Sequence, residues 1–161
     1  MDYSYSWQGF KELAFEIQAN NFFEVESTPT ILIESWKRTF VSRMYYFCFH
    51  RAIEVAEHIT DSKKLPTHLE FFYDKYKAHG DIVTFYSELG KEYPMPHILK
   101  QNSYIVSRNV RKLHTMRKEC DYTKNLAQPY LKSTCEQSLI FSESIESSLL
   151  LLRNHFHSKI K

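Results

Sequence analysis

The chain has 161 residues, of which 43% are hydrophobic and 25% are charged, a composition typical of a folded protein that buries its own core. Its 3 glycines are too few for the frequent turns of a sandwich or barrel, which argues against an all-β fold. The formal net charge of +2 is too small to indicate a nucleic-acid-binding protein by bulk charge alone.

The first part of the chain predicts two helices. The first should extend over about residues 7–23. The second should begin at Thr28 and Pro29, because a threonine hydroxyl can cap free backbone N–H groups and proline suits the first helical position. No helix breaker follows before Asp61, so this helix should be about 30 residues long. Its apolar residues recur every three or four positions, as in an amphipathic helix. They are Ile33, Trp36, Phe40 and Met44.

The second part of the chain predicts shorter helices followed by two long ones. We expect a helix between residues 66 and 80, and another over 82–89 that ends at Gly90 as a C-terminal cap. A long helix should follow over residues 97–122, after a proline-containing turn. Pro129 suits the start of the last helix, which should reach almost to the end of the chain.

Long helices joined by short connections predict an all-α protein, an up-and-down bundle of four to six helices formed by a single domain over residues 1–161. No apolar run approaches the roughly 18 residues of a membrane span, and the acidic N-terminus does not resemble a signal peptide, so we expect no membrane association. The cysteines, Cys48, Cys120 and Cys135, form no C-x-x-C pair, which indicates a reducing, cytoplasmic location. The histidines lack zinc-ligand spacings, so we expect neither a metal nor another cofactor.

Two segments carry recognisable motifs. Residues 42–52, S-R-M-Y-Y-F-C-F-H-R-A, match the pattern S-R-x-Y-Y-x-x-F-H-x-A at seven positions. Residues 113–122, L-H-T-M-R-K-E-C-D-Y, match the pattern L-x-x-x-R-x-x-A-D-Y, except that Cys120 stands in place of the alanine. Both patterns are typical of small bacterial and archaeal members of the HEPN superfamily. The chain therefore resembles this family over about residues 30–125.

The resemblance implies a protein that acts on RNA. Catalysis in this superfamily is associated with an arginine and a histidine that are four to six residues apart, with a polar residue directly after the arginine. In this chain Arg108, Asn109 and His114 match that pattern. There the histidine would act as general acid or base, and the arginine would stabilise the charged transition state. The resemblance thus implies a metal-independent endoribonuclease that works as a homodimer in a toxin–antitoxin or antiviral defence system, with a cognate antitoxin as a further partner.

Helix geometry groups several polar residues independently of the family. Arg43 and His50 are seven positions apart and share a helix face. Arg117 lies within an apolar stripe of the later helix, and Asp121, one turn on, is its expected partner. That stripe consists of Val106, Val110, Leu113 and Cys120. Two interpretations stay open: the ion pair only stabilises the bundle, or it belongs to a polar cleft that binds RNA or another ligand. The cleft would comprise Arg43, His50, His114, Arg117 and Asp121.

Basic residues of the later helix favour an anionic partner, because Arg111 and Lys118 point outward and can contact a phosphate backbone. Solvated helix faces carry similar charges, so this observation alone does not identify a binding surface.

Arg108 and His114 lie about 120° apart around an ideal helix, so they can converge only through a kink or across a dimer axis. The alternative function is a non-catalytic helical module that binds nucleotide, RNA or a partner protein. Four leucines over 149–152 exceed one core-facing stripe, so two should face a second copy or another protein.

Overall fold

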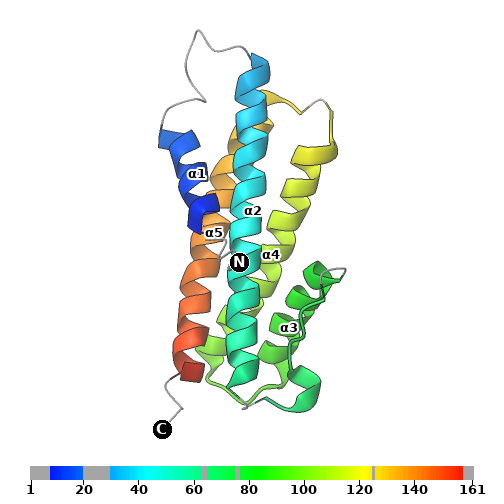
Figure 1. Ribbon diagram of the computed structural model, residues 1–161, viewed down its shortest axis with the longest axis vertical. Helices are drawn as coiled ribbons and strands as arrows, with labels where there is room; N and C mark the ends of the chain where they lie inside the picture. The colour runs from blue at the N-terminus through cyan, green and yellow to red at the C-terminus, as the bar shows by residue number, and fades with distance from the viewer. Residues whose placement is uncertain (1–7, 20–29, 63–64, 75–76, 125, 158–161) are drawn as a thin grey trace, which may run out of the picture. The chain divides into compact units, whose positions relative to one another are not determined.

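The structure, a computed structural model, describes residues 8–19, 30–62, 65–74, 77–124 and 126–157. Within these ranges the regular structure is helical and no β-strand occurs. This confirms an all-α protein with a number of helices in the expected range of four to six. The elements are α1 (Gln8–Ala19), α2 (Thr30–Asp61), the 3-10 turn η1 (Thr67–Leu69), α3 (Ala78–Glu92), α4 (His97–Tyr122) and α5 (Gln128–His157) (Figure 1).

The three long helices were predicted well from the sequence. α4 begins and ends at the expected residues, and α5 begins one residue before Pro129. α2 ends at Asp61 as expected, while the cap predicted at Thr28 and Pro29 lies outside the described residues. The described part of the first helix ends at Ala19, so the predicted end near Phe23 also lies outside the described residues.

The helix predicted between residues 66 and 80 is wrong. Over the described residues 66–74 the helical structure is limited to η1, and the backbone becomes extended at Glu70, with φ −68° and ψ 136°. The next helix, α3, begins at Ala78. Leu69, the last residue of η1, and Phe71, in the extended segment, are buried, at 5% and 6% exposed. The backbone N–H of Phe71 donates to the hydroxyl of Thr60 at 2.9 Å, which replaces a helical hydrogen bond.

The described residues belong to two compact units, which are treated one at a time below. Unit 1 comprises Met1–Phe47 and Lys112–Ser142, and unit 2 comprises Cys48–Arg111 and Glu143–Lys161. Because α2, α4 and α5 each pass from one unit to the other, each unit contains a part of all three helices. Whether the chain behaves as one cooperative domain stays a prediction.

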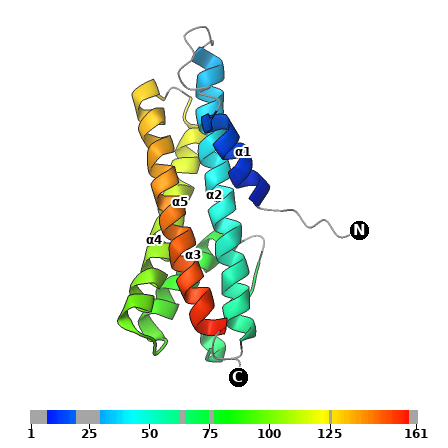
Figure 2. The same cartoon turned by 90° about the vertical axis from the view of Figure 1, so that its left-hand side faces the viewer.

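In unit 1, the first part of α2, the last part of α4 and the first part of α5 run in alternating directions (Figure 1). α1 lies along the first part of α2 (Figure 2), where Ala14 is fully buried and the Lys11 ammonium lies 5.2 Å from the centre of the Phe47 ring. The buried apolar cluster of this unit draws on all four helices. It consists of Ala14, Phe40, Val41, Met44, Cys120, Leu131 and Cys135.

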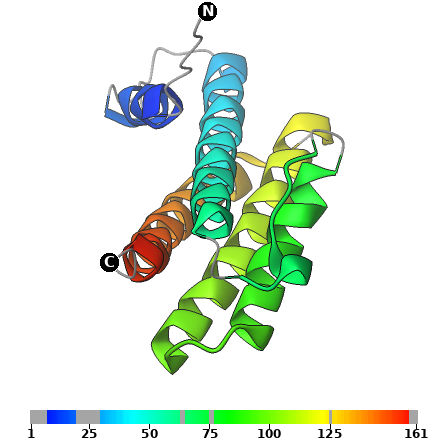
Figure 3. The ribbon, with the colours of Figure 1, turned by 60° about the horizontal axis from the view of Figure 1, so that its bottom comes forward.

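In unit 2, α3 and the first part of α4 form an antiparallel helical hairpin (Figure 3). The hydroxyl of Ser107 donates to the carbonyl oxygen of Val83 at 2.9 Å, and that of Ser103 to Tyr86 at 2.6 Å. Gly90 lies inside α3, which continues to Glu92, so its predicted role as a C-terminal cap is wrong. A Cβ atom at Gly90 would stand 3.2 Å from the carbonyl oxygen of Lys100, and glycine therefore permits the close approach of the two helices.

Candidate functional site

The candidate site is an open cleft in unit 1, on the flank of α2. Its lining on α2 includes side chains at positions 38, 42 and 46, which recur every four residues and share one helix face. The opposite flank of this stretch is buried, with Val41 and Met44 in the core. The cleft has a volume of about 280 Å³ and is lined by Arg38, Thr39, Ser42, Arg43, Tyr46 and Asp121.

Asp121 joins the two motif segments. The hydroxyl of Ser42 donates to Asp121 Oδ1 at 2.8 Å, across 79 positions of sequence. Arg117 Nε lies 2.6 Å from Asp121 Oδ2, so the ion pair expected from the i,i+4 spacing forms. The side chains of Arg117 and Asp121 are only 20% and 27% exposed, and such a partly desolvated pair is less screened than a surface pair.

The guanidinium of Arg117 also contacts two aromatic rings. Its central carbon lies 5.4 Å from the centre of the Tyr46 ring and 5.7 Å from the centre of the Tyr122 ring, both within cation–π range. Tyr122 is 71% exposed. Arg117 therefore lies between Tyr46, which lines the cleft, and Tyr122, whose ring is open to solvent.

His114 lies on α4 in the same unit and stacks on Tyr45. The two ring centres are 5.4 Å apart, with an angle of 30° between the ring planes. Burial lowers the pKa of His114 below its ordinary value, and the neighbouring cations of Lys118 and Arg117 lower it further. His114 is therefore neutral at pH 7, the form in which a histidine can accept a proton. Tyr45 is almost fully buried, as expected for a core aromatic residue, and burial raises its pKa.

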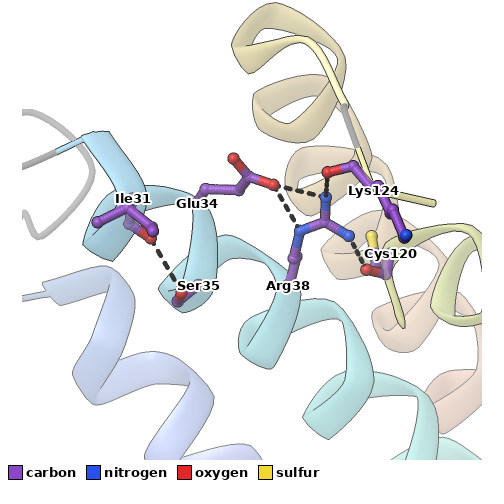
Figure 4. Close-up of polar contacts among 6 residues, drawn as sticks. All are labelled: Ile31, Glu34, Ser35, Arg38, Cys120 and Lys124. Carbon is purple, nitrogen blue, oxygen red and sulfur yellow. Dashed lines mark hydrogen bonds and ion pairs between the residues drawn. The ribbon is translucent and has the colours of Figure 1, made fainter. Parts of the chain in front are cut away.

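Arg38 fixes the end of α4 against α2. Its guanidinium makes two contacts with Glu34 Oε1, at 2.9 and 2.5 Å (Figure 4). It also donates to the backbone carbonyl oxygen of Cys120 and, at 3.3 Å, to that of Lys124 (Figure 4). These carbonyl groups are at and beyond the C-terminal end of α4, where helical partners run out and a cation is favourable. Arg38 thereby holds the turn that presents Asp121.

The residues predicted to be catalytic belong to different units. Arg108 and Asn109 are in unit 2, whereas His114 is in unit 1. Arg108 is exposed, and its Nε lies 3.4 Å from Asn109 Oδ1. Asn109 is 2% exposed, and its amide donates to the Ser144 hydroxyl on α5 at 3.3 Å. A side chain held in this way positions its neighbours more readily than it contacts a substrate. Arg111, also in unit 2, is exposed as expected.

His50, also predicted for the site, belongs to unit 2. Its ring packs edge-on against Phe49 with ring centres 5.0 Å apart, and Phe49 also contacts His79 at 4.4 Å. Burial and the neighbouring His79 lower the pKa of His50 to about 4. His50 is therefore neutral across the physiological range. Of the other predicted residues, Arg43 lines the cleft of unit 1. Lys118, which follows Arg117 on α4, is exposed.

Several residues of the cleft were not predicted as site residues. Arg38 and Thr39 precede the motif of residues 42–52, but their four-residue spacing to Ser42 and Arg43 could have placed them on the same face. Tyr46, a residue of the first motif, is half-buried and forms part of the cleft wall.

Comparison with known proteins found no match, neither a family model nor a curated protein nor a solved structure. Among the described residues, no three His, Cys, Asp or Glu side chains gather as metal ligands would. None of the helices within the described ranges is long and apolar enough to cross a membrane. The chemistry available in the cleft is that of arginine and tyrosine, groups that can bind phosphate and stack on a base. His114, on α4 in the same unit, lies against Tyr45 and is not among the residues that line the cleft.

Proposed function

We propose that the chain is an HEPN-type RNA-acting protein that binds RNA at the cleft of unit 1. The observation that carries the proposal is the meeting of the two motif segments around one carboxylate. Ser42, from the first motif, and Arg117, from the second, both contact Asp121. Three of the residues that carry the family resemblance, Ser42, Arg117 and Asp121, are therefore in contact.

The cleft offers the two interactions that single-stranded RNA requires. Arginine binds phosphate oxygens through paired N–H donors, and Arg43 lines the cleft on the α2 side. The exposed ring of Tyr122, held beside Arg117, can stack on an unpaired base. Lys118, one residue after Arg117, adds a basic group on the outer face of α4.

The proposed activity is metal-independent cleavage of RNA. In its neutral form His114 would take the proton from a ribose 2′-hydroxyl, which then attacks the adjacent phosphorus and forms a 2′,3′-cyclic phosphate. The P–O5′ bond breaks, and the 5′ oxygen takes a proton from a second acid or from water. The guanidinium of Arg108 would stabilise the charge that develops on the phosphate oxygens. Asn109, with its amide bonded to Ser144, would position this turn of α4. A toxin–antitoxin or antiviral defence system is the setting that we propose for such an activity.

Cleavage of a panel of transfer RNAs and structured RNAs in EDTA tests the proposal. His114→Ala and Arg108→Ala should each lower the rate by at least about a hundredfold, the usual effect of losing a general base or an oxyanion-stabilising group. His68→Ala and Lys91→Ala, at exposed positions of unit 2, serve as controls and should cleave normally. A folded wild-type protein that cleaves nothing, or variants that cleave like it, would refute the catalytic part.

The alternative function is a non-catalytic helical module that binds nucleotide, RNA or a partner protein. The buried amide of Asn109 favours it, because a side chain used inside unit 2 cannot reach a substrate directly. Fluorescence anisotropy with a labelled single-stranded RNA separates the two functions. Binding that requires Arg43 without any cleavage would establish the binding module. Cleavage that disappears in His114→Ala would establish the enzyme.

We further propose that the protein forms a homodimer through the second part of α5. Leu150 and Leu151 are 58% and 47% exposed, while Leu149 and Leu152 are buried, so two leucines face outward as the sequence predicted. Acidic residues precede the exposed pair on α5 and basic residues follow it. They are Glu143 and Glu146 before the pair, and Arg153 and His157 after it.

This charge pattern is self-complementary. A two-fold axis across α5 near Leu150 would place the acidic part of one helix against the basic part of the other, as an isologous interface requires. Leu150→Glu should then give a folded monomer, measured by light scattering and circular dichroism. Ile140→Glu, a change at another exposed apolar position of α5, is the control and should leave the dimer intact. A wild-type monomer at micromolar concentration would refute the interface.

A further inference from the structure

Unit 2 contains a second cavity, remote in sequence from both motifs. It lies between the extended segment after η1 and one face of α3, and its volume is about 270 Å³. The α3 residues that line it recur at positions 81, 84, 85 and 88, which is the spacing of a single helix face. This size is slightly below that of typical drug-sized pockets, roughly 300–1,000 Å³, and suits a single side chain.

The floor of this cavity is aromatic. Phe71 and Phe85 are 6% and 7% exposed, and their rings meet edge to face with centres 5.5 Å apart. Phe72, which also lines the cavity, is 71% exposed, and the following Tyr73 is 49% exposed. An apolar shelf therefore extends from the cavity along the extended segment.

The walls of the cavity carry three carboxylates and one imidazole, that of His68, whose Nε2 lies 3.0 Å from Glu92 Oε2. Glu70, Asp81 and Glu88 all line it, and each is half-buried. Glu88 has a cationic neighbour, since the Lys91 ammonium lies 3.3 Å from its carboxylate. Among the described residues, the carboxylates of Glu70 and Asp81 have no ion-pair partner. Carboxylates that are partly withdrawn from water gain from a cation, and aromatic faces attract one.

We propose that this cavity is the docking site for a basic segment of a partner protein, whose arginine or lysine side chain enters it. The two unpaired carboxylates would bind the cationic head group, and the rings of Phe71 and Phe85 would contact its aliphatic stem. An apolar residue next to that arginine or lysine in the partner segment would cover Phe72 and Tyr73. A small free amine would leave both rings exposed to water. A bare metal ion would use the carboxylates but not the aromatic floor.

The site is independent of the RNA cleft. Its residues belong entirely to unit 2, whereas the cleft belongs to unit 1. Loss of one activity should therefore leave the other unchanged. RNA cleavage or binding by the Asp81→Asn variant provides this check, because Asp81 contributes to no contact in the cleft.

Fluorescence anisotropy with designed peptides tests the proposal on the full chain. The probe is a fluorescein-labelled peptide, Ala-Leu-Ala-Arg-Ala-Leu-Ala, compared with the same peptide carrying citrulline, which has nearly the shape of arginine without its charge. The arginine peptide should bind at least about tenfold more tightly. Glu70→Gln and Asp81→Asn should each abolish this difference while the circular dichroism spectrum stays unchanged.

A matched control distinguishes the cavity from acidic surface in general. Glu57 of α2 has the carboxylates of Glu54 and Asp61 as neighbours, but it lines neither cavity. Glu57→Gln should leave the peptide affinity unchanged. Equal binding of the citrulline peptide, or equal loss in Glu57→Gln, would overturn the proposal. Competition by spermidine at the concentration of the peptide would overturn it too, because it would identify a site for free amines rather than for a protein segment.

Discussion

Replacement of Asp121 by asparagine gives the sharpest test of how the cleft is held together. The change keeps the size of the side chain and an oxygen that can accept from Ser42, but it removes the negative charge beside Arg117. Surface ion pairs contribute about 0–1 kcal/mol, and breaking a fully buried pair costs about 3–5 kcal/mol. With side chains 20% and 27% exposed, the pair lies between these limits, at about 2 kcal/mol.

A second effect acts in the opposite direction. Asp121 lies in the last turn of α4, where the helix dipole disfavours a negative charge by about 0.3–1 kcal/mol. The net loss of unfolding free energy should therefore be about 1–2 kcal/mol. For a chain of this size each kcal/mol corresponds to roughly 2–4 °C, so the midpoint of thermal unfolding should fall by about 2–8 °C.

Asp61→Asn is the matched control, since it makes the same chemical change at the last residue of α2. At Asp61 the helix dipole and the neighbouring carboxylate of Glu57 both disfavour the negative charge, so the variant should be as stable as the wild type or slightly more stable. Differential scanning fluorimetry measures both variants. Equal unfolding temperatures for Asp121→Asn and Asp61→Asn would refute the ion-pair argument. In RNA binding, Asp121→Asn should raise affinity a few-fold, because one negative charge leaves the cleft.

Three further outcomes are expected. Gly90→Leu should lower the free energy of unfolding in urea by about 2–3 kcal/mol, because the new leucine side chain meets the carbonyl oxygen of Lys100. Gly80→Ala is the control and should raise it by about 0.5 kcal/mol, because a Cβ atom there has no neighbour within 4 Å. Between pH 6.5 and about 4, His50 takes up a proton in the unfolded chain but not in the folded one, because its folded pKa is about 4. As the pH falls through this range, the wild type should lose about 1–2 kcal/mol of unfolding free energy relative to His50→Gln, after allowance for partial exposure of the ring. Parallel plots of unfolding free energy against pH for the two proteins would contradict this. Tyr122→Ala should weaken binding of single-stranded RNA by about tenfold in anisotropy without lowering the unfolding temperature, since its ring is 71% exposed.

The sequence predicted the features that depend on local spacing. α4 was located at both ends because prolines precede it and its apolar stripe has a clear helical period. The ion pair of Arg117 and Asp121 followed from their i,i+4 positions on that helix. Predictions failed where tertiary packing decides the conformation. Residues 70–74 have helix-compatible side chains, but burial of Phe71 and its hydrogen bond to Thr60 favour an extended backbone.

Tertiary packing also explains the wrong prediction at Gly90. A glycine after a short apolar run is typical of a helix end, and only the approach of α4 at Lys100 shows why it is needed within α3. The contact of Ser42 with Asp121 spans 79 positions, so no local pattern could reveal it. The motif match located both residues but could not show which atoms meet. Arg38 was missed because its partners at the end of α4 are backbone carbonyl groups, which carry no residue-specific pattern.

The lowered pKa of His114 restricts the role that this residue can have in catalysis. In the proposed cleavage, a neutral His114 accepts the proton of a 2′-hydroxyl, and in a concerted reaction a second group would protonate the departing 5′ oxygen. In the proposed homodimer, the second copy of the chain would supply that group. The dimer and cleavage assays are therefore linked. A monomeric Leu150→Glu variant that keeps full cleavage would show that one chain contains both the acid and the base. Loss of cleavage with retained RNA binding would show that the site is completed by the partner chain.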